Sequence, residues 1–237
     1  DWEFAHLGDP VLDLAQVRTR DFYNPGADMS EWWRLYREVS GRTLDLNKLR
    51  YYTVKSMLIT PLALAGVVQN MVAQTDHAEW YAQDVCYKRA TAEALAEAVG
   101  VELDPPPMPE HDAGAASEIV ALIETQLVGE HRAELPDDYA RYRMDLLRRL
   151  LTHVQNLDRL EAPLAAQDAE DLADLLGRAV SVERPDDQQL LALIESGGPG
   201  RDAELVRYLH RRSVREEWLF RGALGVGENA IFQSVTG

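Results

Sequence analysis

Hydrophobic residues recur every three to four positions along most of the chain, which is the spacing of one face of an α-helix. In the first hundred residues this pattern predicts four helices, separated by capping residues, glycines and prolines. We expect them to start after Asp9-Pro10, at Ser30, at Asp45 and at Ala78, with breaks at Asn24-Pro25-Gly26, Gly41, after Met71 and at Gly100. Pro61 is expected to kink or split the third helix, because proline lacks an amide hydrogen.

The same periodicity predicts about five further amphipathic helices beyond residue 110. They run near Ala115–His131, Asp137–Leu160, Pro163–Leu176, Pro185–Glu195 and Arg201–Leu219. Ala162-Pro163 is expected to separate two of them. No segment alternates between apolar and polar residues over the length of a strand. The predicted fold class is therefore mainly α.

Five residues, Pro105-Pro106-Pro107-Met108-Pro109, form the clearest linker in the sequence. They predict a boundary between a first unit at residues 1–103 and a second at 117–237, joined by residues 104–116. Consecutive prolines neither continue a helix nor donate backbone hydrogen bonds. We expect an exposed linker between two partly independent units, and the alternative is a rigid loop packed on one continuous helical body.

Acidic residues number 40 against 24 basic ones, which gives a net charge of −16. Residues 1–100 carry 14 acidic and 10 basic side chains, so most of the excess falls in the rest of the chain. Such a balance argues against nucleic acid or an anionic membrane as a partner of a general basic surface. It does not choose between small-molecule partners.

The single cysteine, Cys86, excludes an internal disulfide and fits a reducing, cytoplasmic compartment. It follows helical periodicity next to Tyr87, where a small buried hydrophobe is favoured over a nucleophile. No apolar run approaches the roughly 20 residues of a membrane span, and no segment resembles a signal peptide. We therefore expect no membrane partner.

The most informative segment is residues 1–15, DWEFAHLGDPVLDLA. It resembles the metal-binding segment of the bacterial aminoglycoside-phosphotransferase-like and choline-kinase-like enzymes, in which Asp-aromatic-Glu precedes Gly-Asp-Pro-x-x-Asp-Leu-Ala. Residues 36–42 and 49–52 resemble helices that follow in the same family. The resemblance covers roughly residues 1–100 and is strongest in the first fifteen. It implies the helical C-lobe of a protein-kinase-like fold.

The resemblance also assigns roles to individual residues. Asp1 occupies the position of the aspartate that binds the Mg²⁺ bridging the nucleotide phosphates, a task for hard oxygen ligands. Glu3 either supports this cofactor site or faces solvent. Asp9 is expected to cap a helix and Asp13 to be a buried anchor for a neighbouring catalytic loop. His6 is expected to be a hydrogen-bonded packing residue.

Several parts of such an enzyme are missing from this sequence. It contains no His-Gly-Asp catalytic run, no glycine-rich strand turn and no strand lysine for ATP phosphates. We therefore expect the chain, cut at its N-terminus, to be the C-terminal portion of an ATP- and Mg²⁺-dependent phosphotransferase, inactive alone. No residue of the chain is assigned a catalytic role.

The acceptor would be a hydroxyl group of a small molecule. The sequence of residues 1–15 most resembles the branch of the family associated with acyl-CoA dehydrogenases, which implies a hydroxyacyl-type substrate. Other members of the wider family act on aminoglycosides, choline-like alcohols and sugars. Trp32 and Trp33 are candidates for the wall of an acceptor pocket. Core packing is the expectation for at least one of them.

The helices after the linker faintly resemble a small helical domain of unknown function that accompanies such bacterial kinases. They contain no catalytic constellation, and a protein partner is their expected ligand. The alternative reading of the whole chain is a non-catalytic scaffold or interaction module on a degenerate kinase C-lobe. The basic cluster Arg211, Arg212 and Arg215 is followed by Glu216 and Glu217, which predicts a solvated, self-paired face rather than an anion site.

Overall fold

The computed structural model of the chain describes residues 7–26, 28–70, 76–110, 114, 116–182, 187–197 and 200–235. Asp1, Glu3 and His6 lie outside these residues. Most of the described residues are helical, and none of them belongs to a strand. The prediction of a mainly α fold is confirmed. The C-lobe part of that prediction remains an expectation.

The main helices, in chain order, are α1 (Pro10–Tyr23), α2 (Met29–Ser40), α3 (Leu46–Gln69), α4 (His77–Val99), α5 (Ser117–Glu124), α6 (Asp138–Leu176), α7 (Asp187–Ser196) and α8 (Asp202–Trp218). A π-helical turn, Thr125–His131, and a 3₁₀ turn, Arg132–Glu134, extend α5. A further 3₁₀ turn covers Gly225–Asn229.

Aspartates begin several of these helices. The side chains of Asp9, Asp45 and Asp137 accept hydrogen bonds from free amides of the first turn, as the sequence predicts for Asp9 and Asp45. The cap of α2 is Asp28 and not Ser30, whose own amide donates to the Asp28 carboxylate at 2.9 Å. A carboxylate two residues earlier serves this helix end better, because it is charged and faces the positive end of the helix dipole.

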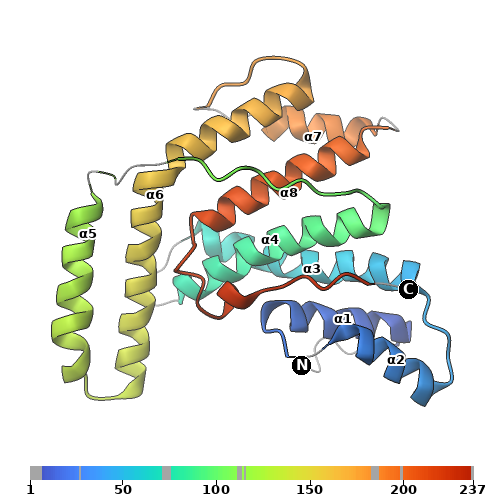
Figure 1. Cartoon of the computed structure of the whole chain (residues 1–237), viewed down its shortest axis with the longest axis horizontal. Helices are drawn as coiled ribbons and strands as arrows, with labels where there is room; N and C mark the ends of the chain where they lie inside the picture. Colours follow the sequence, from blue (N-terminus) through green and yellow to red (C-terminus); the bar gives the residue numbers. More distant parts are fainter. Residues whose placement is uncertain are drawn as a thin grey trace.

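Two prolines lie inside continuous helices, which contradicts the expected separation at Ala162-Pro163 and, for Pro61, excludes a split helix but not the expected kink. α3 runs through Pro61 and α6 runs through Pro163 as one helix of 39 residues. Figure 1 shows that α6 changes direction about midway along its length. Leu160 and Leu164 are buried on either side of Pro163, so packing of the flanking turns offsets the lost hydrogen bond.

Helix α4 lies at the centre of the molecule. α3 packs along one side of it and α8 along another, and α1 packs on α3 (Figure 1). The second half of α6 packs against α8, with α7 nearby, whereas α5 and the first half of α6 stand apart as a two-helix arm. The hydrophobic core therefore surrounds α4.

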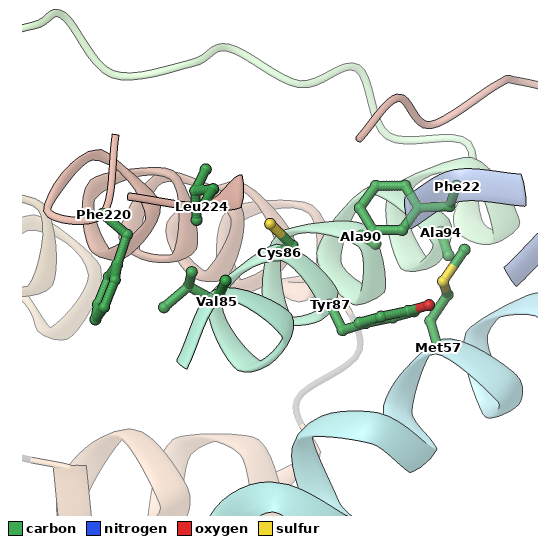
Figure 2. Packing of buried hydrophobic residues seen from close by; sticks show 10 residues of the cluster. Phe22, Met57, Val85, Cys86, Tyr87, Ala90, Ala94, Phe220 and Leu224 are labelled. Atoms are coloured by element: carbon green, nitrogen blue, oxygen red, sulfur yellow. The ribbon is translucent and has the colours of Figure 1, made fainter. Parts of the chain in front are cut away.

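This core contains residues from both sides of the expected domain boundary. Phe22, Met57 and Cys86 come from the first unit, and Phe220 and Leu224 come from the segment after α8. Figure 2 shows these side chains converging on α4. Cys86 is fully buried, as predicted, and burial raises the pKa of its thiol.

The proline-rich segment is docked on the helices that follow it. Pro106 is buried, the Arg207 guanidinium donates to the Glu102 carbonyl at 3.1 Å, and the Gln167 amide donates to the Pro107 carbonyl at 3.3 Å. The boundary at residues 104–116 stays a prediction. Together with the shared core, these contacts favour the alternative of one continuous helical body.

The C-terminal segment 230–235 returns along α1 and α4 (Figure 1). It is held by Arg18, a side chain only 2% exposed, which donates to the Gln233 carbonyl at 2.6 Å and pairs with Glu97 at 2.7 Å. The same guanidinium lies over the Phe232 ring at 4.3 Å. Val235 is buried beside α1 and α2, and its amide donates to Glu97 at 2.6 Å. A distant part of the sequence thus completes the N-terminal helices.

Helix α3 has a property that the sequence reading missed. Among the described helices it is long and apolar enough to cross a membrane by length and composition, with a mean hydropathy of 1.3 over its best window, of which 22% is buried. Pro61 lies within this apolar stretch, and because a proline is expected to interrupt the helix, the sequence predicts two shorter apolar segments instead of one long one. Core helices of water-soluble proteins meet the same criterion, and α3 packs on α4 and α1.

His153 on α6 makes stability depend on pH. Burial lowers the pKa of His153, whose ring stacks on Phe220 at 3.7 Å between centroids and whose Nδ1 lies 2.7 Å from the Leu219 carbonyl. Since the folded pKa lies below the unfolded value of about 6.5, the unfolded chain binds more protons in acid. The contribution of His153 is therefore complete above about pH 6.5 and is lost as the pH falls through the folded pKa.

We expect the free energy of unfolding to fall less steeply between neutral and acid pH in His153→Phe than in the wild type. Urea unfolding at a series of pH values measures this difference. Identical slopes for the two proteins would contradict it.

Candidate functional site

A large hollow of about 1080 Å³ lies between α1, the start of α2 and the middle of α3. We call it the α1–α3 groove. It is lined by Asp13, Gln16, Val17, Thr19, Arg20, Asp21, Asn24, Gly26, Met29, Trp32, Ser56, Ile59, Thr60 and Tyr87. Its size suits a small-molecule ligand.

One face of α1 forms a polar wall of this groove. Asp13, Gln16, Arg20, Asp21 and Asn24 follow helical spacing, opposite the buried side of the helix. Asp13 is exposed, so the expectation of a buried anchor is wrong for this structure. Its carboxylate can accept a hydrogen bond from a hydroxyl or an ammonium group.

The two tryptophans of α2 have different environments. Trp33 is 3% exposed and packs in the cluster with Val11 and Leu49, whereas Trp32 is 46% exposed and lines the groove. The expectation that at least one of them is a core residue is confirmed. Adjacent residues on a helix point about 100° apart, and here the 100° turn from Trp33 takes Trp32 out of the core. The exposed ring of Trp32 offers a flat apolar surface to a ligand.

Ser56 is the one buried hydroxyl in the groove lining that has no hydrogen-bond partner among the described residues. It is 4% exposed and belongs to α3. Other polar groups nearby are satisfied within the protein: Tyr87 Oη donates to the Thr19 carbonyl at 3.2 Å, and burial raises the pKa of Tyr87 to about 12. An unpaired buried hydroxyl is costly, so the Ser56 hydroxyl is free to bond a polar atom of a molecule bound in the groove.

The C-terminal segment shapes the rim of the groove. Gln233 donates to the Asp21 carboxylate at 2.8 Å and accepts from the Met29 amide at 3.2 Å. Asp21 also accepts from the Gly26 amide at 3.0 Å, which closes the turn between α1 and α2. A single glutamine from the far end of the chain therefore joins both helices at this rim.

The expected cofactor residues cannot be placed in this geometry. Asp1, as metal ligand, and Glu3, as cofactor residue, lie outside the described residues, and so does His6. Asp9 is described, caps α1 through the Val11 amide at 3.0 Å and pairs with Lys48 at 2.8 Å. Hydrogen bonding to Lys48 lowers the pKa of Asp9. The prediction that Asp9 caps this helix is confirmed.

The described residues contain no group of three or more histidine, cysteine, aspartate or glutamate side chains that could hold a metal ion. They therefore offer no complete magnesium site.

The basic cluster on α8 differs from its prediction. Arg215 is buried and pairs with Asp168 at 3.2 Å and with Asp171, while Arg211 pairs with Asp171 at 2.9 Å. Both aspartates belong to α6. Arg211 and Arg215 therefore bridge α8 to α6 and do not form a solvated face, whereas Arg212 pairs with Glu216 on its own helix at 3.7 Å, as expected, and with Asp187 at 2.7 Å. The charges of the cluster are neutralised within the protein.

Sequence reasoning missed most of the groove residues. The polar stripe of α1 could have been found by its helical spacing. Ser56 and Tyr87 carry no such signal, because they reach the groove only through the packing of α3 and α4, and Gln233 bonds the rim residues Asp21 and Met29 only because the C-terminal segment returns to α1. Comparison of the chain with protein-family models, with curated proteins and with solved structures finds no match.

Proposed function

We propose that this chain is the C-terminal portion of an ATP- and Mg²⁺-dependent phosphotransferase that acts on a hydroxyl group of a small molecule. The observation that carries the proposal is the opening pattern of residues 1–15, in which Asp1 and Glu3 precede Gly8-Asp9-Pro10 and Asp13-Leu14-Ala15. The helix start within this pattern has a physical role in the structure, since Asp9 caps α1.

In this proposal the α1–α3 groove binds the acceptor molecule. It lies beside α1, which begins within the motif, and it combines carboxylates, an unpaired hydroxyl and one exposed indole ring. Carboxylates and hydroxyls bind the hydroxyl groups of an acceptor, and Trp32 covers its apolar part. A hydroxyacyl-type substrate, with a polar and an apolar part, suits both surfaces.

Transfer of labelled phosphate from ATP, measured with the protein extended upstream through its catalytic loop, tests the proposal. We expect Trp32→Ala and Asp13→Asn to raise the acceptor KM about tenfold and to leave the KM for ATP unchanged. Leu35→Ala is a matched control, because Leu35 lies on the same helix, is 50% exposed and does not line the groove. Equal effects of the control and groove variants would exclude the groove as acceptor site.

A non-catalytic interaction module is the second candidate, and one observation favours it. The arm formed by α5 and the first half of α6 exposes large apolar side chains, including Ile119, Leu122 and Leu147. Such residues on a protruding hairpin are typical of a protein-binding surface. Absence of phosphoryl transfer in the extended protein, with an intact catalytic loop, would favour this candidate.

A further inference from the structure

Helix α2 is the least embedded of the helices around the α1–α3 groove. Of its 12 residues, only Met29 and Trp33 are buried. By backbone proximity, α2 approaches no other described helix as closely as α1 approaches α3. In Figure 1 it lies at the edge of the molecule, beside α1. Helices in proteins draw most of their stability from burying an apolar face, so α2 is held in place by few contacts.

The polar side chains of α2 bond mainly to one another. Arg34 pairs with Glu38 at 2.7 Å and with Glu31 at 3.5 Å, all on the same helix. Among the residues that the structure describes, one hydrogen bond joins α2 to a part of the chain outside residues 28–42. It runs from the Met29 amide to the Gln233 side chain and is 3.2 Å long. The C-terminal segment therefore provides this attachment.

The C-terminal segment is itself fixed to the body of the molecule. Arg18 of α1, Arg50 of α3 and Arg89 of α4 each donate to one of its backbone carbonyls, at distances between 2.6 and 3.2 Å. Charged donors make stronger hydrogen bonds than neutral ones. Because these bonds use the backbone of the segment, the side chains of Gln233 and Val235 remain to contact α1 and α2.

Gln233 and Val235 attach α2 to this fixed segment. The Gln233 side chain joins the Met29 amide, at the first turn of α2, to the Asp21 carboxylate on α1, which lies 2.8 Å away. Val235 is 4% exposed and packs in the same apolar cluster as Met29 and Trp33. We call Gln233 and Val235 the α2 latch.

Helix α2 also supplies one wall of the groove. Met29 and Trp32 line it, facing residues of α1 and α3. Non-helical residues 24–26 and 41–45 flank α2 on both sides, and Gly41 has a left-handed φ of 66°. Changes of backbone dihedral angles at the ends of an element allow a helix to move as a unit. The wall that carries Trp32 is therefore the one with flexible connections and few contacts.

We propose that α2 is a lid on the α1–α3 groove and that the α2 latch holds it closed. Release of the latch lets α2 swing about its flanking residues and carries Trp32 away from the groove. The other walls stay in place, because α1 and α3 pack on each other and on α4. The C-terminal end of the chain thus controls access to a site built from the N-terminal helices. The effect on acceptor binding rests on the proposed function, whereas the movement itself does not.

The distance between α2 and α3 tests the lid directly. Spin labels on Leu35→Cys and Lys55→Cys in the full chain report this distance by pulsed electron paramagnetic resonance. Both side chains are exposed, and neither lines the groove. Cys86 is buried and takes no label. We expect a single distance with the latch intact and a second, longer distance after Gln233→Ala combined with Val235→Ala.

Ser234→Ala is the matched control for the latch variants. Ser234 lies between the two latch residues and is exposed, so its replacement should leave the single distance unchanged. A distance distribution that is the same with and without the latch side chains overturns the proposal. So does a longer distance that appears equally in Ser234→Ala.

Hydrogen exchange separates opening of the lid from loss of the fold, in case Val235→Ala destabilises the chain. In Gln233→Ala alone we expect the amides of α2 to exchange roughly fivefold faster, as loss of one hydrogen bond would produce, while those of α4 keep the wild-type rate. Equal acceleration in α2 and α4, or none in α2, overturns the lid. Both measurements use the chain without ATP or acceptor, so their outcome is independent of whether the extended protein transfers phosphate.

Discussion

If the protein is the proposed phosphotransferase, replacement of Asp1 by asparagine in the chain extended upstream is expected to reduce phosphoryl transfer about a thousandfold, equivalent to roughly 4 kcal/mol of activation barrier. The physical reason is the loss of a negative charge and a hard oxygen ligand where the resemblance places the metal. Asparagine has nearly the same volume, so the fold should be retained. The measurement is kcat at saturating Mg-ATP, with circular dichroism as the check on folding.

Two controls make this result specific. Asp9→Asn changes a carboxylate in the same motif that caps α1 and pairs with Lys48, so it should leave kcat nearly unchanged. The chain as printed should show no transfer, because it contains no His-Gly-Asp run. Wild-type kcat in Asp1→Asn would remove the metal role, and turnover by the chain alone that survives Asp1→Ala would remove the family assignment.

Replacement of Arg18 by methionine is expected to destabilise the protein by about 3–5 kcal/mol, the usual cost of breaking a buried ion pair from one side. The substitution leaves the Glu97 carboxylate without its guanidinium and the Gln233 carbonyl without a donor. Burial lowers the pKa of Arg18, and the hydrogen bond and the charge of Glu97 oppose this effect. For a chain of this size the midpoint of thermal unfolding should fall by on the order of 10 °C.

The double variant Arg18→Met with Glu97→Leu separates charge from packing. It removes both buried charges and should recover part of the lost stability. Arg34→Met, on an exposed ion pair of α2, serves as control and should change the midpoint little. If Arg18→Met behaves like Arg34→Met, the C-terminal segment is not held in the way that the structure describes.

The helix pattern could be predicted because its signals are local. Asp9 and Asp45 start helices since their carboxylates reach amides two or three residues away. Gly41 and Gly100 end helices in left-handed conformations, with φ of 66° and 71°, which cost residues with a Cβ atom more. Such interactions need no distant partner. The sequence alone therefore determined the mainly α class and most helix starts.

Tertiary packing decided the features that depend on distant neighbours. Pro163 lies inside α6 because buried leucines on both sides offset one lost hydrogen bond. Arg18 can be buried because Glu97 and the Gln233 carbonyl bond its guanidinium. No residue spacing in the sequence predicts these contacts.

The candidate groove shows the same division. Its polar wall on α1 follows helical periodicity, which a sequence determines, because residues three and four apart share a face. Three other features depend on how α3 and the C-terminal segment pack against α1 and α2. They are the position of Trp32 rather than Trp33 in the groove, the unpaired hydroxyl of Ser56, and the hydrogen bonds of Gln233 at the rim. Side chains from separate segments make a site only when the fold brings them together. Periodicity within one helix carries no information about which segments will meet.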